Sequence, residues 1–115
     1  MKLLLAIIQP TKLKAVQEAL AEFEVERLTV FDAHGYARQR GHTETFRGAE
    51  YQSNLLRKIA LEIAVNDDFL ERTIDAIVTV SRSGPDGNIG DGKVFVLPLE
   101  DCWQIGGETR GPSAI

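Results

Sequence analysis

The sequence has few of the residues that cross-linked, metal-binding or nucleic-acid-binding proteins need. Its 115 residues contain a single cysteine, Cys102, so an internal disulfide and a cysteine metal cluster are both excluded. We therefore expect a reducing compartment, with the cytoplasm as the default. The formal net charge of −4 argues against nucleic acid as the main partner, because phosphate backbones bind to cationic surfaces. Any site for an anion must therefore be local.

Long apolar runs and catalytic motifs are absent too. The apolar run 3–8 is stopped by Gln9 and Pro10, which makes it too short for a signal sequence or a membrane span. No nucleophile elbow, Cys-His pair or paired-carboxylate motif stands out, so the sequence favours a protein that is not an enzyme and is not inserted into a membrane. The two histidines, His34 and His42, lack nearby partners that would complete a metal site.

What is present is the pattern of one folded domain over residues 1–115, since 43% of the residues are hydrophobic and 26% are charged. Asp68 and Glu71 have the spacing of a capping box at the start of a helix. Apolar runs and alternation predict strands over 2–9, 28–31, 56–64 and 94–97, and helical spacing predicts helices over 11–23 and 69–81. The resulting order, βαββαβ, is that of a ferredoxin-like α+β fold.

Two segments lack any such period. Residues 35–55 are polar and partly basic, and a compact domain rarely keeps so long an irregular loop without a function, so we expect this loop to contact a partner. Tyr51 lies in it as an accessible phenol that an enzyme could modify, although most loop tyrosines make partner contacts or pack locally. The tail over 99–115 is expected to be an irregular arm, ordered only if something holds it.

A glycine-rich turn over 83–92 is the clearest candidate for an anion site. Around Gly90 and Gly92, consecutive backbone N–H groups can converge, and Lys93 adds a positive charge, which suits a phosphate group. The turn is not a Walker A loop, because Val94 replaces the magnesium-binding Ser or Thr and a strand follows instead of a helix. The alternative is a turn that only connects the helix to the strand.

Cationic and amide side chains flank the two ends of the long loop. Arg38, Gln39 and Arg40 are near its first end and Lys58 is near its second, so folding the loop back would bring these donors together around an anion. Solvated surface charge is the alternative, and it is favoured for Arg40. Lys58 is different, because a lysine in an alternating strand must emerge on the open face of that strand.

Three segments carry a resemblance to a known family. Residues 38–44 have the sequence RQRGHTE, residues 46–51 have FRGAEY, and residues 90–98 have GDGKVFVLP. In this order and on this topology, they make the chain similar to the PII signal-transduction proteins of the GlnB/GlnK type over nearly its whole length.

The resemblance implies a homotrimer of ferredoxin-like subunits that binds ATP or ADP in the clefts between subunits. Nucleotide contacts are then expected from Thr29, Gly35, Arg38, Gln39, Gly90, Gly92 and Lys93. Gln39 also matches a residue that completes magnesium coordination with ATP and 2-oxoglutarate. Lys58 matches one that pairs with a carboxylate of 2-oxoglutarate, and Gly41 one that lends it a backbone contact.

The resemblance also implies how the protein acts on its partners. A long T-loop, here about 37–55, projects to target proteins, and the bound ligands select its conformation. Such proteins regulate ammonium transporters and enzymes of nitrogen assimilation, so a membrane transporter or a metabolic enzyme is the expected partner. Tyr51 matches a tyrosine that is uridylylated in some members, whereas Ala49 excludes the serine phosphorylation of others.

Phe46 and Ala37 are mild departures from the family pattern, which usually has tyrosine and glycine there, and two further departures concern the nucleotide site. The turn over 84–88 is longer by about three residues, and Gln104 and Gly106 stand where two arginines reach the ATP phosphates from the neighbouring subunit. These departures motivate an alternative: a divergent PII-like sensor that prefers ADP or AMP and responds to another small anion, such as bicarbonate, to control a different transporter or pathway. A third interpretation is a small enzyme whose phosphate site is the glycine turn, although no catalytic base is visible.

Overall fold

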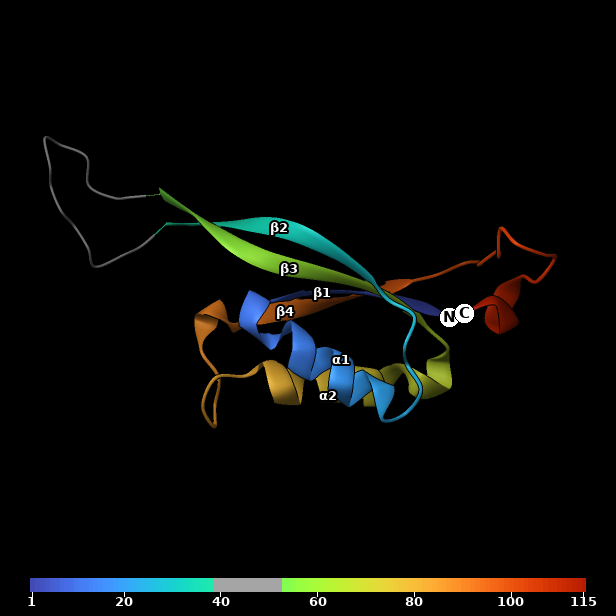
Figure 1. The fold of residues 1–115 in the computed structure, drawn as a ribbon, viewed down its shortest axis with the longest axis horizontal. Helices are drawn as coiled ribbons and strands as arrows, with labels where there is room; N and C mark the ends of the chain where they lie inside the picture. The colour runs from blue at the N-terminus through green and yellow to red at the C-terminus, as the bar shows by residue number, and fades with distance from the viewer. Residues whose placement is uncertain (39–52) are drawn as a thin grey trace, which may run out of the picture.

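The computed structural model describes residues 1–38 and 53–115 and shows one β-sheet with two helices packed on it (Figure 1). The elements are β1 (Lys2–Ile8), α1 (Leu13–Ala21), β2 (Thr29–Arg38), β3 (Ser53–Val65), α2 (Leu70–Ser81) and β4 (Gly92–Pro98). Four short 3₁₀ turns cover Pro10–Lys12, Asp67–Phe69, Ile89–Asp91 and Gly111–Ala114. None of the helices in these ranges is long and apolar enough to cross a membrane.

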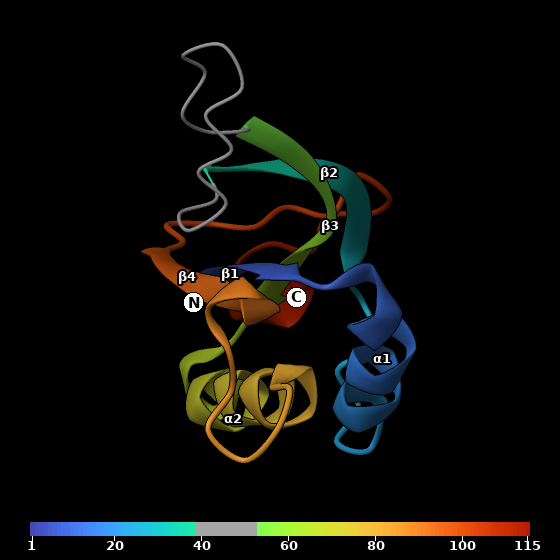
Figure 2. The ribbon, with the colours of Figure 1, turned by 90° about the vertical axis from the view of Figure 1, so that its left-hand side faces the viewer.

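The sheet has the strand order β2-β3-β1-β4, and each neighbouring pair is antiparallel. The central strand β1 places Leu4 opposite Ile63 of β3 and Val96 of β4. Figure 2 shows that α1 and α2 lie on the same side of this sheet. The ferredoxin-like α+β fold predicted from the order of elements is therefore confirmed.

The core lies between the helices and one face of the sheet. Alternate residues of β1, including Leu4 and Ile8, are buried against the helices, because successive side chains of a strand point to opposite faces. Val16 and Leu20 of α1 and Ile77 of α2 fill the other side of this layer. Each fully buried side chain of this size contributes about 1.5–3 kcal/mol, so the helical layer is held mainly by apolar burial.

The opposite face of the sheet is apolar as well. Phe31 of β2 lies opposite Ala60 of β3, and Phe95 and Leu97 of β4 lie opposite Leu5 and Leu3 of β1. In the single chain, Phe31 is 44% exposed, Phe95 47% and Leu97 42%. The sheet thus has a second apolar face that the chain itself does not cover.

The paired strands β2 and β3 are longer than predicted. The sequence predicts a strand over 28–31 and an irregular loop over 35–55, but β2 runs to Arg38 and β3 begins at Ser53. Asp32 and Gly35 have low strand propensity, yet here the ladder with β3 pairs their backbone, which outweighs that preference. Figure 1 shows both strands extending past the ends of β1 and β4.

The predicted capping box at the start of α2 does not form. No side-chain cap is present at Asn66 or Phe69, and the 3₁₀ turn Asp67–Phe69 leads into the helix instead. The Asp67 carboxylate accepts a hydrogen bond from the Met1 ammonium group at 3.0 Å, and this contact lowers the pKa of Asp67. A tertiary contact with the chain terminus therefore takes the place of local capping.

The tail after β4 is not irregular throughout. Its backbone forms a small hairpin, in which Gln104 N–H donates to Thr109 O at 3.0 Å and Gly111 N–H donates to Cys102 O at 2.7 Å. Ala114 is buried, and the Asn66 side chain donates to Pro112 O at 3.1 Å. The arm is thus held by its own chain, at the end of the molecule away from the tips of β2 and β3 (Figure 1).

Candidate functional site

The glycine turn is shaped by one aspartate. The Asp91 carboxylate accepts hydrogen bonds from Ser83 N–H at 2.9 Å, from the Ser83 hydroxyl at 2.6 Å and from Asn88 N–H at 2.7 Å. Asn88 in turn donates its side-chain amide to the Ser83 hydroxyl at 2.7 Å. These bonds, above all that from the Ser83 hydroxyl, lower the pKa of Asp91 to about 2. We call these three residues the Asp91 clasp.

Gly92 is required where the turn enters β4. Its φ is +117°, and a β-carbon at this position would lie 1.8 Å from the carbonyl oxygen of Ile7. Only glycine tolerates both this conformation and this approach of two backbones. The close contact places the glycine turn directly against the end of β1.

Two side chains, one from within β3 and one from the residue after β1, meet at the Gly90 carbonyl. Lys58 Nζ donates to Gly90 O at 2.8 Å, and Gln9 Nε2 donates to the same oxygen at 2.6 Å. The register explains this convergence. Ile8 is opposite both Ile59 and Gly92; Gln9 and Lys58 lie one residue beyond these pairs, and Gly90 lies two residues beyond. Gln9 was not predicted as a site residue from the sequence, because its position after an apolar run is the only signal it carries.

Gly35 lies beside Lys58. It is opposite Leu56 in the ladder between β2 and β3, and a β-carbon on it would lie 3.5 Å from Lys58 Cγ. The structure therefore brings together three of the predicted site residues, namely Gly35, Lys58 and Gly90. Lys93 is exposed on β4 opposite Ile7, and its ammonium group lies 6.0 Å from the ring centroid of Phe95.

Other predicted site residues are not part of this cluster. Thr29 is at the start of β2 opposite Glu62, six residues or about 20 Å along the strand from Gly35. Arg38 is the last residue of β2. Gln39, Gly41 and Tyr51 lie outside the described residues, so these predictions remain as the sequence made them.

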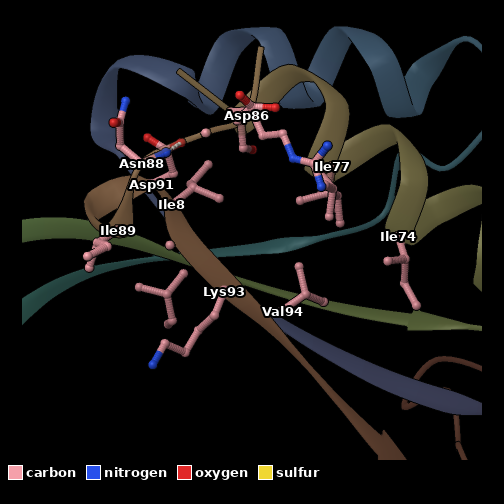
Figure 3. A pocket seen from close by; sticks show the side chains of 15 residues that line it. Ile8, Ile74, Ile77, Asp86, Asn88, Ile89, Asp91, Lys93 and Val94 are labelled. Carbon is pink, nitrogen blue, oxygen red and sulfur yellow. Dashed lines mark hydrogen bonds between the residues drawn. The ribbon is translucent and has the colours of Figure 1, made fainter. Parts of the chain in front are cut away.

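A cavity of about 700 Å³ borders the clasp, between α2, β1 and β4. Figure 3 shows Ile74 and Ile77 of α2 facing Val94 of β4, with Asn88 and Asp91 at the end formed by the glycine turn. Within the ranges 1–38 and 53–115, no group of three His, Cys, Asp or Glu side chains could hold a metal ion. Lys93 lines this cavity together with the carboxylates of Asp86 and Asp91, whereas Lys58 is not among the lining residues.

The comparison with known families agrees with this geometry. The sequence profile described as "Nitrogen regulatory protein P-II" matches residues 1–109. The chain belongs to the P-II family. This membership confirms the resemblance found in the three sequence motifs, and it assigns the chain to a family of regulatory proteins.

Individual P-II relatives match over all or nearly all of their lengths. The chain is 51% identical to nitrogen regulatory protein GlnK1 of Methanosarcina mazei over all 115 residues, which cover 97% of that protein. It is 44% identical to nitrogen regulatory protein P-II of Azospirillum brasilense, with both chains covered completely. It is 46% identical to GlnK of Escherichia coli K12 over 105 residues, 91% of each chain.

Proposed function

We propose that this P-II protein senses adenine nucleotides and 2-oxoglutarate and regulates nitrogen-related target proteins through the loop over about 37–55. The observation that carries the proposal is the meeting of Lys58 with the glycine turn, where its ammonium group bonds Gly90 O at 2.8 Å. An effector held by Lys58 would lie directly beside a nucleotide held by the turn. Two ligands that share one cluster can influence each other's affinity.

The glycine turn and Lys93 would hold the nucleotide phosphates. Gly90 and Gly92 offer backbone N–H groups without side chains in the way, and the Asp91 clasp fixes the turn before a ligand arrives. Lys93 adds a charge on the exposed face of β4. Arg38 and Gln39 are proposed to add contacts from the end of β2 and the residue that follows it.

Lys58 would pair with a carboxylate of 2-oxoglutarate. Its ammonium group has three donors, so the bond to Gly90 O leaves two for a carboxylate. Gln39 and Gly41 would complete this site. Magnesium would arrive bound to the ATP phosphates, and Gln39 would be its protein ligand. Asp91 is not proposed as a ligand, because its carboxylate oxygens already accept hydrogen bonds from Ser83 and Asn88.

A homotrimer would explain why Thr29 lies apart from the turn. If the nucleotide lies between two copies, Thr29 of one copy contacts it opposite the glycine turn of another. The uncovered apolar face with Phe31, Phe95 and Leu97 supports this assembly, because exposed apolar patches of this kind mark interaction surfaces.

The function requires no turnover. Bound nucleotide and effector would shift the population of conformations that a target reads, and Tyr51 in the same loop would be the site of modification. The partner is proposed to be a membrane transporter or a metabolic enzyme, and the protein is proposed to act in the cytoplasm without entering the membrane.

A second candidate function is a divergent sensor that prefers ADP or AMP and answers to another small anion. It is favoured by Gln104 and Gly106, which bring no charge to a triphosphate. Arg110, the nearby cation of the same arm, is engaged by Asp101 and lies 4.0 Å from the ring centroid of Trp103. The arm thus offers less positive charge to a third phosphate.

Calorimetric titration of ATP and ADP, each with magnesium and with or without 2-oxoglutarate, tests the proposal. We expect 2-oxoglutarate to bind only beside ATP and magnesium, and Lys58→Ala to abolish this binding while ADP still binds. Lys14→Ala, an exposed lysine of α1, is the matched control. Binding of ADP or AMP with no response to 2-oxoglutarate would replace the proposal with the divergent sensor.

A further inference from the structure

The Gly90 carbonyl has two donors of different character. Lys58 brings a charged ammonium group from β3, and Gln9 brings a neutral amide from the end of β1. A carbonyl oxygen has two lone pairs, so both bonds can exist at once. At 2.6 Å and 2.8 Å, neither bond is long enough to be a marginal contact.

The two donors respond differently to an arriving anion. A carboxylate that approaches Lys58 forms a charge-assisted hydrogen bond, which is stronger than the bond to a neutral carbonyl. The Gly90 oxygen, at 2.8 Å from Nζ, is also the negative end of a dipole and opposes the carboxylate. Effector binding therefore draws Lys58 away from Gly90, whereas the uncharged Gln9 gains no ion pair by leaving.

We propose that Gln9 is a positioning residue that holds the Gly90 carbonyl when Lys58 turns to a dicarboxylate. This inference rests on the proposed function and adds the link between its two ligands. Without Gln9, Lys58 would be the sole side-chain donor to the Gly90 carbonyl among the described residues, so a move of its ammonium group toward an effector carboxylate would weaken its hold on the glycine turn. With Gln9, the turn stays in place for the nucleotide phosphates while the effector binds.

A double-mutant cycle on ADP affinity, without any dicarboxylate, tests whether the two donors substitute for each other. The variants are Gln9→Met, Lys58→Met and the double variant, measured by calorimetry. We expect each single change to raise the Kd of ADP by less than about threefold and the double change to raise it by more than about tenfold. If Gln9→Met changes the Kd by the same factor in both backgrounds, the two residues act independently and the inference is wrong.

A second readout follows the effector itself. In Gln9→Met, the factor by which 2-oxoglutarate tightens ATP binding should fall, because the move of Lys58 to the effector then weakens the support of the turn. By linkage, the factor by which ATP tightens 2-oxoglutarate binding should fall by the same amount. An unchanged factor overturns the inference. Gln9→Lys in the Lys58→Met background restores a donor and should recover ADP binding, and failure to recover it counts against the carbonyl as the target.

Matched controls keep this test separate from folding and from the proposed function. Gln17→Met and Lys14→Met make the same changes on the exposed side of α1, and both should bind ADP like the unchanged protein. If the unchanged protein binds ADP and the cycle is additive, only the role of Gln9 is wrong. If the unchanged protein binds no adenine nucleotide, the proposed function is wrong, and the role of Gln9 is overturned with it.

Discussion

The glycine turn and the C-terminal hairpin are each organised by an aspartate, and the two aspartates use their oxygens differently. Asp91 accepts hydrogen bonds from uncharged donors of Ser83 and Asn88. Asp101 accepts one backbone hydrogen bond, from Cys102 N–H, but the guanidinium group of Arg110 is the partner that lowers its pKa most. One carboxylate therefore shapes a backbone, whereas the other neutralises a cation.

This difference decides which region can hold an anion. Within the part of the chain that the structure describes, neither Lys58 nor Lys93 has a carboxylate partner; Lys58 donates to the Gly90 carbonyl, and Lys93 lies 6.0 Å from the ring centroid of Phe95. Arg110 has its carboxylate partner in the same hairpin. The position of a cation in the sequence is thus a poor guide to its availability.

Among changes in the two regions, Gly92→Ala in the glycine turn is expected to have the largest effect on stability and nucleotide binding. A methyl group would collide with the Ile7 carbonyl at 1.8 Å, and the φ of +117° is strained for any other residue. We expect a loss of about 3 kcal/mol or more in the free energy of unfolding. Urea denaturation measures it, together with loss of nucleotide binding.

Gly84→Ala is the matched control for this change. Gly84 also has a positive φ, +73°, but no atom lies within 4 Å of the added β-carbon. It should cost about 1–2 kcal/mol from backbone strain alone. Equal effects of the two changes would mean that the contact with Ile7, and with it the fixed position of the turn, is unimportant.

The fold was predictable from the sequence because its signals are local. The continuous apolar run of β1 and the helical spacing in α2 each predict an element from neighbouring residues alone, and no distant contact is needed to see this. The ends of β2 and β3 were not predictable in the same way. Their extension depends on a partner strand that satisfies the backbone of residues with low strand propensity.

The candidate site was predictable only in part. Glycines and a lysine identify the turn, and the family resemblance points to Lys58. The role of Gln9 depends on the register that places Lys58 and Gly90 within its reach, and spacing along the chain does not encode that register. The capping pair predicted at Asp68 failed, while Asn88 and Asp91 form the reciprocal bonds of a capping box in the turn.

A smaller effect, limited to the glycine turn, is expected from Asp91→Asn. The amide nitrogen cannot accept the hydrogen bonds that the carboxylate oxygen accepts, so the turn loses its shape and the affinity for ADP should fall about tenfold. Calorimetry measures this, with Asp75→Asn on the exposed side of α2 as the control. Unchanged affinity would mean that the clasp does not prepare the turn for a ligand.

The same variant tests the pH dependence of stability. The pKa of Asp91 falls from 3.8 to about 2 on folding, so the ionised form is favoured in the folded state. Its contribution is complete above the ordinary pKa and is lost as the pH falls through about 2. The difference in Tm between the unchanged protein and Asp91→Asn should therefore be constant from pH 7 to about pH 5 and shrink between about pH 4 and pH 2. A difference that stays constant to pH 2 contradicts the clasp.

The smallest effect on nucleotide binding is expected from Arg110→Ala, although its effect on the hairpin should be clear. The guanidinium group lies over Trp103, the single tryptophan, so its removal should change the tryptophan fluorescence. Because Asp101 already neutralises this charge, the Kd of ATP should change by less than about twofold. Asp101→Asn is the complementary change, because it removes the carboxylate partner of Arg110. It should tighten ATP binding if the arm reaches the phosphates. A loss of ATP affinity of about tenfold or more in Arg110→Ala would mean that this arginine does serve the nucleotide in place of Gln104 and Gly106.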